Sequence, residues 1–140
     1  MSEALLTVES LEAGYGEVQV LWGISLGAAS GKLTTIVGAN GVGKTTSLLA
    51  IARGLMSDPD LLVIDELSLG LAPLVVHLIF STLKTLKDGG LTILLVEQNV
   101  HLAFALSDYA YVVAEGRLFT EGPPDQLAEK AEIRQAYLGL

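Results

Sequence analysis

The sequence contains no cysteine and only two histidines, and both scarcities exclude classes of function. Without cysteine, disulfides and thiolate metal sites are excluded. Two histidines with no cluster of histidine and glutamate leave transition-metal catalysis unsupported. No run of 18 apolar residues occurs, so we expect no membrane-spanning helix. The first residues show no basic segment followed by an apolar core, so we expect no secretory signal.

Charge is also scarce. Charged residues make up 17% of the chain and apolar residues 51%, whereas about 25% charged is usual. One interpretation is a well-filled α/β core with buried parallel strands. The other is an apolar surface that meets partner subunits. The net charge of −8 argues against nucleic acid as the main partner. We expect a single domain over residues 1–140.

The most informative pattern that is present lies at residues 38–45. It is a complete G-x-x-x-x-G-K-[ST] phosphate-binding motif, preceded by an apolar, β-branched run and followed by a helix-forming run. A strand, a glycine turn and a helix start direct backbone N–H groups at an anion. Lys44 adds a positive charge for the outer phosphates, and the Thr45 hydroxyl can bind Mg²⁺. The alternative is a glycine turn that only caps a helix.

The apolar periodicity predicts alternating strands and helices. Strands are expected at residues 4–12, 18–30, 33–37, 61–65, 91–96, 109–114 and 116–121. Helices are expected at residues 44–56, 74–87, 100–107 and 124–137. This order predicts a mostly parallel sheet between helical layers, with a small antiparallel layer at the N-terminus.

Two further strand ends carry polar residues, where open α/β sheets place their chemistry. Asp65 and Glu66 follow an apolar strand: one carboxylate can hold Mg²⁺ and the other can activate water. A solvated pair of strand-end carboxylates is the alternative. Residues 97–99, Glu-Gln-Asn, end the next apolar run. They either reach a γ-phosphate or simply cap the following helix.

Four other side chains are candidates of lower weight. Tyr15 lies in a turn, where its ring either stacks on a purine base or packs against the protein. His77 is expected on a helix surface, and Trp22 in a core or an interface. His101 lies three positions after Gln98, so a role in sensing a γ-phosphate is the alternative to a plain surface histidine.

Together these residues resemble the ATP-binding subunit of ABC transporters, and most closely the branched-chain amino acid importer type. The resemblance rests on residues 14–16 (GYG), 37–46 (VGANGVGKTT), 62–66 (LVIDE), 68–73 (SLGLAP) and 94–99 (LLVEQN). Members of that branch carry glutamine where most ABC ATPases carry a switch histidine, and here that position is Gln98. The resemblance extends over nearly the whole chain and implies a P-loop NTPase fold.

The resemblance also implies roles for individual residues. Glu66 would be the general base and Gln98 a second catalytic residue. Thr45 and Asp65 would bind Mg²⁺. The implied nucleotide-binding residues are Tyr15, Gly38, Asn40, Gly41, Gly43, Lys44, Thr45 and Thr46. The implied cofactors are ATP and Mg²⁺, and the implied partners are a second ATPase subunit, contacted by residues 68–71, and permease subunits. The location implied is cytoplasmic, peripheral on the inner face of the membrane.

The chain departs from the family in one large respect. The block that holds the glutamine loop, the helical subdomain and the Leu-Ser-Gly-Gly signature has no counterpart, and the flanking helices are joined near residues 47–49. Leu67 stands where the family has proline. The lost strand belongs at the sheet edge, so we expect the inner strands to survive and a new edge to be exposed.

Because each ABC subunit donates its signature loop to the nucleotide of the other, we expect weak Mg-ATP binding and little or no hydrolysis by this chain alone. Three interpretations stay open: an ATPase subunit that works in a mixed dimer, a non-catalytic module that pairs with a full-length subunit, and a remnant or gene-model artefact. A small P-loop kinase is a fourth interpretation, and the sequence shows no lid or acceptor motif for it.

Overall fold

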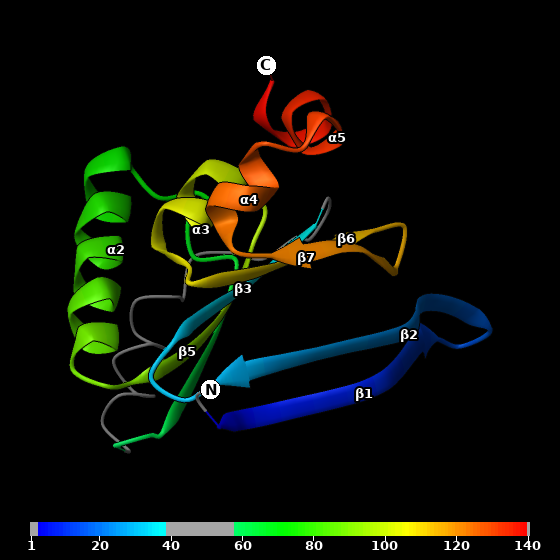
Figure 1. The fold of residues 1–140 in the computed structure, drawn as a ribbon, viewed down its shortest axis with the longest axis horizontal. Helices are drawn as coiled ribbons and strands as arrows, with labels where there is room; N and C mark the ends of the chain where they lie inside the picture. The colour runs from blue at the N-terminus through cyan, green and yellow to red at the C-terminus, as the bar shows by residue number, and fades with distance from the viewer. Residues whose placement is uncertain (1–2, 39–57, 140) are drawn as a thin grey trace.

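The computed structural model describes residues 3–38 and 58–139. The predicted helix over residues 44–56 and most of the predicted phosphate loop lie outside these ranges. The described part consists of a five-stranded sheet, a two-stranded antiparallel ribbon and a set of helices (Figure 1). The prediction of an α/β fold with a small N-terminal antiparallel layer is therefore confirmed.

The main sheet has the strand order β4-β5-β3-β6-β7. Its strands are β3 (Leu33–Gly38), β4 (Leu61–Asp65), β5 (Thr92–Glu97), β6 (Tyr109–Ala114) and β7 (Arg117–Gly122). Strand β5 pairs in parallel with β3 on one side and with β4 on the other, and β6 pairs in parallel with β3. Only β7 runs antiparallel to its neighbour. The carboxyl ends of β3, β5 and β4 consequently meet at one edge of the sheet.

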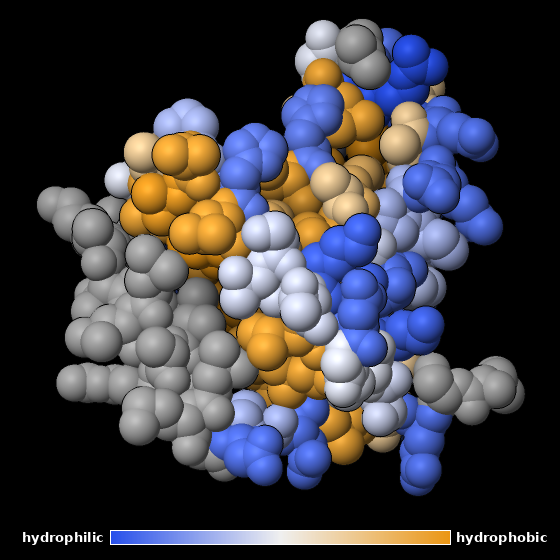
Figure 2. Space-filling model, turned by 90° about the vertical axis from the view of Figure 1, so that its left-hand side faces the viewer, coloured by the Kyte–Doolittle hydropathy of each residue, from blue (hydrophilic) through white to orange (hydrophobic). Residues whose placement is uncertain are grey.

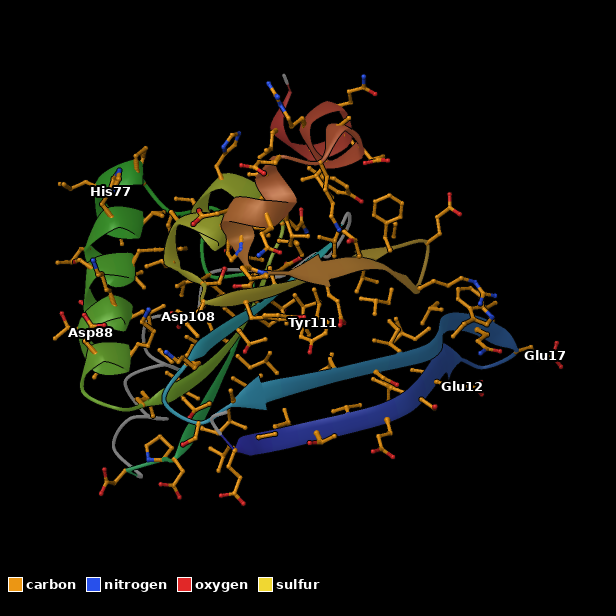
Figure 3. All side chains as sticks on the ribbon, viewed as in Figure 1. Glu12, Glu17, His77, Asp88, Asp108 and Tyr111 are labelled. Atoms are coloured by element: carbon orange, nitrogen blue, oxygen red, sulfur yellow. The ribbon has the colours of Figure 1, made fainter. Side chains whose placement is uncertain are left out.

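The ribbon consists of β1 (Ala4–Tyr15) and β2 (Val18–Ala29), which pair antiparallel. It lies beneath the main sheet in Figure 1, on the side opposite to the helices α3 and α4. The Tyr111 side chain ties it to the centre of the sheet, because its hydroxyl accepts a hydrogen bond of 3.0 Å from the Gly27 N–H. Figure 3 shows Tyr111 between the two layers.

Helix α2 (Pro73–Asp88) is amphipathic, as its sequence predicts. It begins with a proline, whose fixed φ suits the first turn. Its buried side chains recur at helical spacing and pack on the strands: Val76, Ile79, Phe80 and Leu83. They join a core with β3, β4 and β5 that also contains the fully buried Leu67. Helix α3 (Val100–Leu106) follows β5 and contributes Val100 and Ala103 to a second core.

The prediction of one continuous helix over residues 124–137 is wrong. The structure has α4 (Pro124–Ala128), α5 (Ala131–Ile133) and a π-helical turn η1 (Arg134–Leu138), with an extended residue at Lys130 (ψ 127°). Leu127 and Ile133 are both fully buried in the second core. A continuous helix would turn their side chains roughly 120° apart at about 100° per residue. The break at Lys130 lets both reach the same core.

The other predicted elements within the described residues are confirmed, with ends shifted by three residues at most. The apolar residues that accompany the low charge content occur in two places, the buried cores and the surface. Both cores are filled, and large apolar side chains are also exposed, above all Leu74 (81%) and Leu78 (66%) on α2. Figure 2 shows apolar residues gathered on this side of the molecule. None of the described helices has the length and hydropathy needed to cross a bilayer.

The ribbon also contacts the turn between β6 and β7. The carbonyl of Gly116 accepts a hydrogen bond of 3.0 Å from the Trp22 N–H, and the Arg117 guanidinium lies 5.3 Å from the Trp22 ring centroid. Gly116 has a φ of 74°, and a Cβ built there would overlap the Val20 carbonyl oxygen. Trp22 is half-buried and lies outside both cores, with its ring against Gly116, and this contact requires glycine at position 116.

We expect Gly116→Ala to lower the free energy of unfolding by about 2–4 kcal/mol, because it adds a steric overlap to a left-handed backbone. Gly16→Ala is the matched control. Gly16 has a φ of 60° but no atom near its Cβ position, so its cost should be about 1 kcal/mol. Urea unfolding of both variants measures the difference. Equal losses would show that the Val20 contact does not matter.

Candidate functional site

The predicted polar strand ends come together at one edge of the sheet. In the register of the parallel pairs, Val37 lies beside Glu97 and Asp65 beside Val96. The end of β3, which leads into the phosphate motif, is therefore next to residues 97–99, and these are next to Asp65 and Glu66. A nucleotide held by the phosphate motif would lie at this edge.

Glu66 is held in an unusual conformation. It follows β4 with a φ of 49°, in the left-handed region that residues other than glycine, asparagine and aspartate rarely adopt. Its N–H donates a hydrogen bond of 2.8 Å to the Val96 carbonyl, and its side chain is buried (9% exposed). Gln98 Nε2 donates to Glu66 Oε1 at 2.5 Å. The two predicted catalytic side chains are thus in direct contact.

Asp65 has a different environment from its neighbour. It ends β4 and its side chain is exposed. Desolvation raises the pKa of Asp65, and the negative charges of Glu66 and Glu97 raise it further. An exposed carboxylate in a negative field is suited to a hard cation such as Mg²⁺, which usually keeps several waters and bonds to one or two carboxylates. Among the described residues no group of three or more His, Asp or Glu side chains is arranged as a metal site.

Glu97 has a role that the sequence does not reveal. Its carboxylate is 2% exposed and accepts hydrogen bonds from Ser68 N–H (3.2 Å), Ser68 Oγ (2.7 Å), Gln98 N–H (3.0 Å) and Asn99 N–H (3.2 Å). It therefore joins the end of β5 to the loop after Glu66. Asn99 Oδ1 accepts from the Leu102 N–H, so the predicted capping alternative holds for Asn99.

Gly38 ends β3 beside Val113 of β6. A Cβ at this position would lie 3.2 Å from the Val113 carbonyl oxygen, so the strand pairing itself favours glycine here. Tyr15 is the last residue of β1 and pairs with Val18. The remaining predicted nucleotide and metal residues lie outside the described residues: Asn40, Gly41, Gly43, Lys44, Thr45 and Thr46. His77 and His101 are exposed on α2 and α3, and Figure 3 shows His77 on the outer helix.

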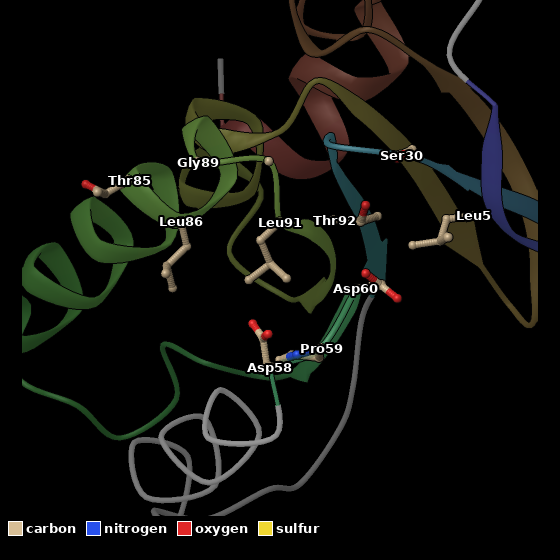
Figure 4. Close-up of a pocket in the computed structure, with 11 residues that line it drawn as sticks. Leu5, Ser30, Asp58, Pro59, Asp60, Thr85, Leu86, Gly89, Leu91 and Thr92 are labelled. Carbon is tan, nitrogen blue, oxygen red and sulfur yellow. The ribbon is translucent and has the colours of Figure 1, made fainter.

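Two cavities flank the sheet. A hollow of about 360 Å³ is lined by both predicted catalytic residues and their neighbours: Glu66, Ser68, Leu69, Gly70, Glu97, Gln98 and Asn99. A larger one of about 530 Å³ is bordered by Asp60 and Thr92, at the amino ends of β4 and β5 (Figure 4). It faces away from the polar strand ends. We place the functional site at the smaller hollow, because chemistry in open α/β sheets lies at the carboxyl ends.

Solved structures share this arrangement of strands and helices. A nucleotide-free ATP-binding cassette from an ABC transporter matches with a TM-score of 0.76 and 17% identity, over 86% of this chain and 92% of that chain. The ADP conformation of the cassette MJ1267 matches with a TM-score of 0.80 and 16% identity, over 99% of this chain and 100% of that chain. The chain has the fold of an ABC ATP-binding cassette. The prediction of a P-loop NTPase fold is confirmed.

In sequence, this chain is similar to ATP-binding proteins of several ABC transporters. The high-affinity branched-chain amino acid transport protein BraG of Pseudomonas aeruginosa is 44% identical over 97 residues, which are 69% of this chain and 42% of BraG. The lipopolysaccharide export ATP-binding protein LptB of Escherichia coli K12 is 33% identical over 89 residues, which are 64% of this chain and 37% of LptB. The chain thus spans less than half of the curated relatives it matches. No protein-family model matches it.

The charge at Asp65 generates a pH prediction. The pKa of Asp65 is raised in the folded protein, so the charged form of Asp65 lowers the free energy of unfolding. This loss is absent below the ordinary aspartate pKa near 4. It appears as the pH rises through the pKa that Asp65 has in the folded protein. We expect Asp65→Asn to raise Tm by about 1–3 °C at about pH 7 without Mg²⁺, and to lose this gain at about pH 3.5. Thermal unfolding in a chelator measures it. Asp60→Asn, at the other end of β4, is the control; equal effects of the two variants at both pH values would contradict the expectation.

Proposed function

We propose that this chain is an ATP-binding subunit of an ABC transporter that holds Mg-ATP at the carboxyl edge of its sheet. The observation that carries the proposal is the contact of the Gln98 amide with the buried Glu66 carboxylate. It lies at the ends of two parallel strands beside β3, which leads into a complete phosphate-binding motif. A fixed carboxylate at that place is positioned to accept a proton from water.

The family resemblance supports the following roles for individual residues. Glu66 is the general base, and the Gln98 amide orients it. Asp65 and Thr45 hold Mg²⁺, and Tyr15 stacks on the adenine. The phosphate-binding residues are Gly38, Asn40, Gly41, Gly43, Lys44 and Thr46, with their backbone N–H groups and the lysine charge. Bound Mg-ATP supplies the phosphoryl group, and the chain supplies position and charge.

Branched-chain amino acid import is the transport process that we propose. Its support is the 44% identity to BraG, together with 31% identity over 97 residues to a probable branched-chain amino acid transport protein, LivG, of Archaeoglobus fulgidus. Gln98 in the sequence Glu-Gln-Asn agrees with the resemblance to that importer branch. The alternatives to branched-chain amino acid import are lipopolysaccharide export and Nod factor export, because relatives named for these functions also match.

We also propose the partners and the location of that assembly. A second ATPase subunit would face the loop at residues 68–71, which follows Glu66 and lines the small hollow. Permease subunits would hold the chain at the inner face of the membrane, as a peripheral cytoplasmic subunit.

A single domain with a missing middle block is part of the proposal. Strand β4 is the edge of the described sheet, as expected if the strand beyond it has been lost. Without a signature motif the chain would present its own ATP to a full-length subunit but could not complete the site of that subunit. The edge position of β4 favours a second candidate function, a non-catalytic module that pairs with a full-length subunit.

Thermal unfolding with Mg-ATP tests the binding site. At about 100 times Kd, Mg-ATP should add about 2.7 kcal/mol and raise Tm by about 5–10 °C. Lys44→Ala should abolish the shift, because the lysine charge is removed from the phosphates. Lys84→Ala, on the exposed face of α2, is the control and should keep it. No shift in the unsubstituted chain, or an equal shift in Lys44→Ala, would overturn the proposed function.

A further inference from the structure

We propose that Glu97 is a positioning residue, which fixes Glu66 for catalysis by holding Ser68 and Gln98 at once. The inference rests on the proposed function for its catalytic part. Its structural part, the fixing of Glu66, stands on the described residues alone.

The charge of Glu97 is satisfied in an unusual way. Its carboxylate is 2% exposed, and its hydrogen-bond partners are three backbone N–H groups and one hydroxyl. Among the described residues no Lys, Arg or His forms an ion pair with it. A buried carboxylate is expensive unless hydrogen bonds compensate the charge. In the described part of the chain the donors to Glu97 are neutral, and they come from two separate loops.

Those two loops meet at Glu66. Ser68 is two positions after Glu66, and Gln98, which donates to the Glu66 carboxylate, directly follows Glu97. One carboxylate therefore holds both the segment that carries the proposed base and the residue that orients it.

Glu66 needs such support because its backbone is strained. A left-handed conformation at a glutamate costs stability and persists only where surrounding contacts enforce it. Contacts from the neighbouring segments hold it: the hydrogen bond from the Glu66 N–H to Val96, the fully buried Leu67, and the Ser68 bonds to Glu97. Gln98 donates directly to the Glu66 carboxylate, and the Glu97 bonds add a second link between this segment and the backbone of Gln98.

Glu97→Gln removes the charge of this side chain and nearly keeps its shape. An amide has nearly the volume of the carboxylate but only one acceptor oxygen, and its NH₂ group would face the donating Ser68 N–H. We expect amide hydrogen exchange at Glu66, Ser68 and Gln98 to accelerate by about tenfold or more. Glu129→Gln, at an exposed glutamate after α4, is the matched control and should change none of these rates.

Hydrolysis distinguishes positioning from simple structural support. With a full-length ATPase subunit present, we expect Glu97→Gln to lower kcat about 10–100-fold while KM for Mg-ATP stays within about threefold, because the phosphate site is untouched. In a Glu66→Gln background the same substitution should have no further effect on kcat, because Glu97 acts through Glu66. If Glu97→Gln does not fold, Ser68→Ala removes one bond to Glu97 and should move exchange and kcat in the same direction.

The outcomes separate the two proposals. Unchanged exchange at Glu66 overturns the positioning role, whatever the hydrolysis rate, and so does a KM that rises as much as kcat falls. With the full-length subunit present, a turnover of the unsubstituted chain no faster than that of Glu66→Gln overturns the catalytic part of the proposed function. In that case the exchange rates at Glu66 and Gln98 alone decide whether Glu97 fixes the pair.

Discussion

The parallel pairing of β5 with both β3 and β4 is the constraint on which the site depends. Residues from three distant parts of the sequence reach one edge only because β5 lies between the other two strands. The hydrophobic core beneath, formed with α2, fixes that order, since Leu33, Ile64 and Leu95 are all buried in it. Strands β4 and β5 then end in the acidic residues Asp65 and Glu97, at a place that the core has already determined.

Much of this could be predicted from the sequence, because parallel strands buried on both faces appear as continuous apolar runs. The apolar runs before Asp65 and Glu97 predict the strands, and the polar residues at the ends of these runs predict the edge of the sheet where the site lies. The break at Lys130 could not be predicted, since the helical pattern of residues 124–137 is locally sound and the shared core of Leu127 and Ile133 decides against it. The bonds between Glu97 and Ser68 join residues 29 positions apart, and no local pattern reports them.

The site combines two features that cost stability. Glu97 is a charge inside the protein, and Glu66 has a backbone conformation that suits few residues. Both would be removed by selection for stability alone, unless their geometry had a use. Asp65 adds to this cost, because it ends its strand in the negative field of Glu66 and Glu97. A cation at Asp65 would relieve that repulsion, so the unfavourable charges favour the ligand that the proposed function requires.

The position of β4 explains how such a site can exist in a chain that matches only part of its relatives. Within the described residues, the hydrogen bonds among Glu66, Ser68, Glu97 and Gln98 join the ends of β4 and β5 and the loops after them, on the inner side of β4. A block removed beyond that edge would leave these bonds intact. What it would remove is the surface that closes on a second subunit. In the proposed function, binding and orientation of the nucleotide would therefore depend on the interior of the sheet, while completion of the reaction would depend on structure outside it.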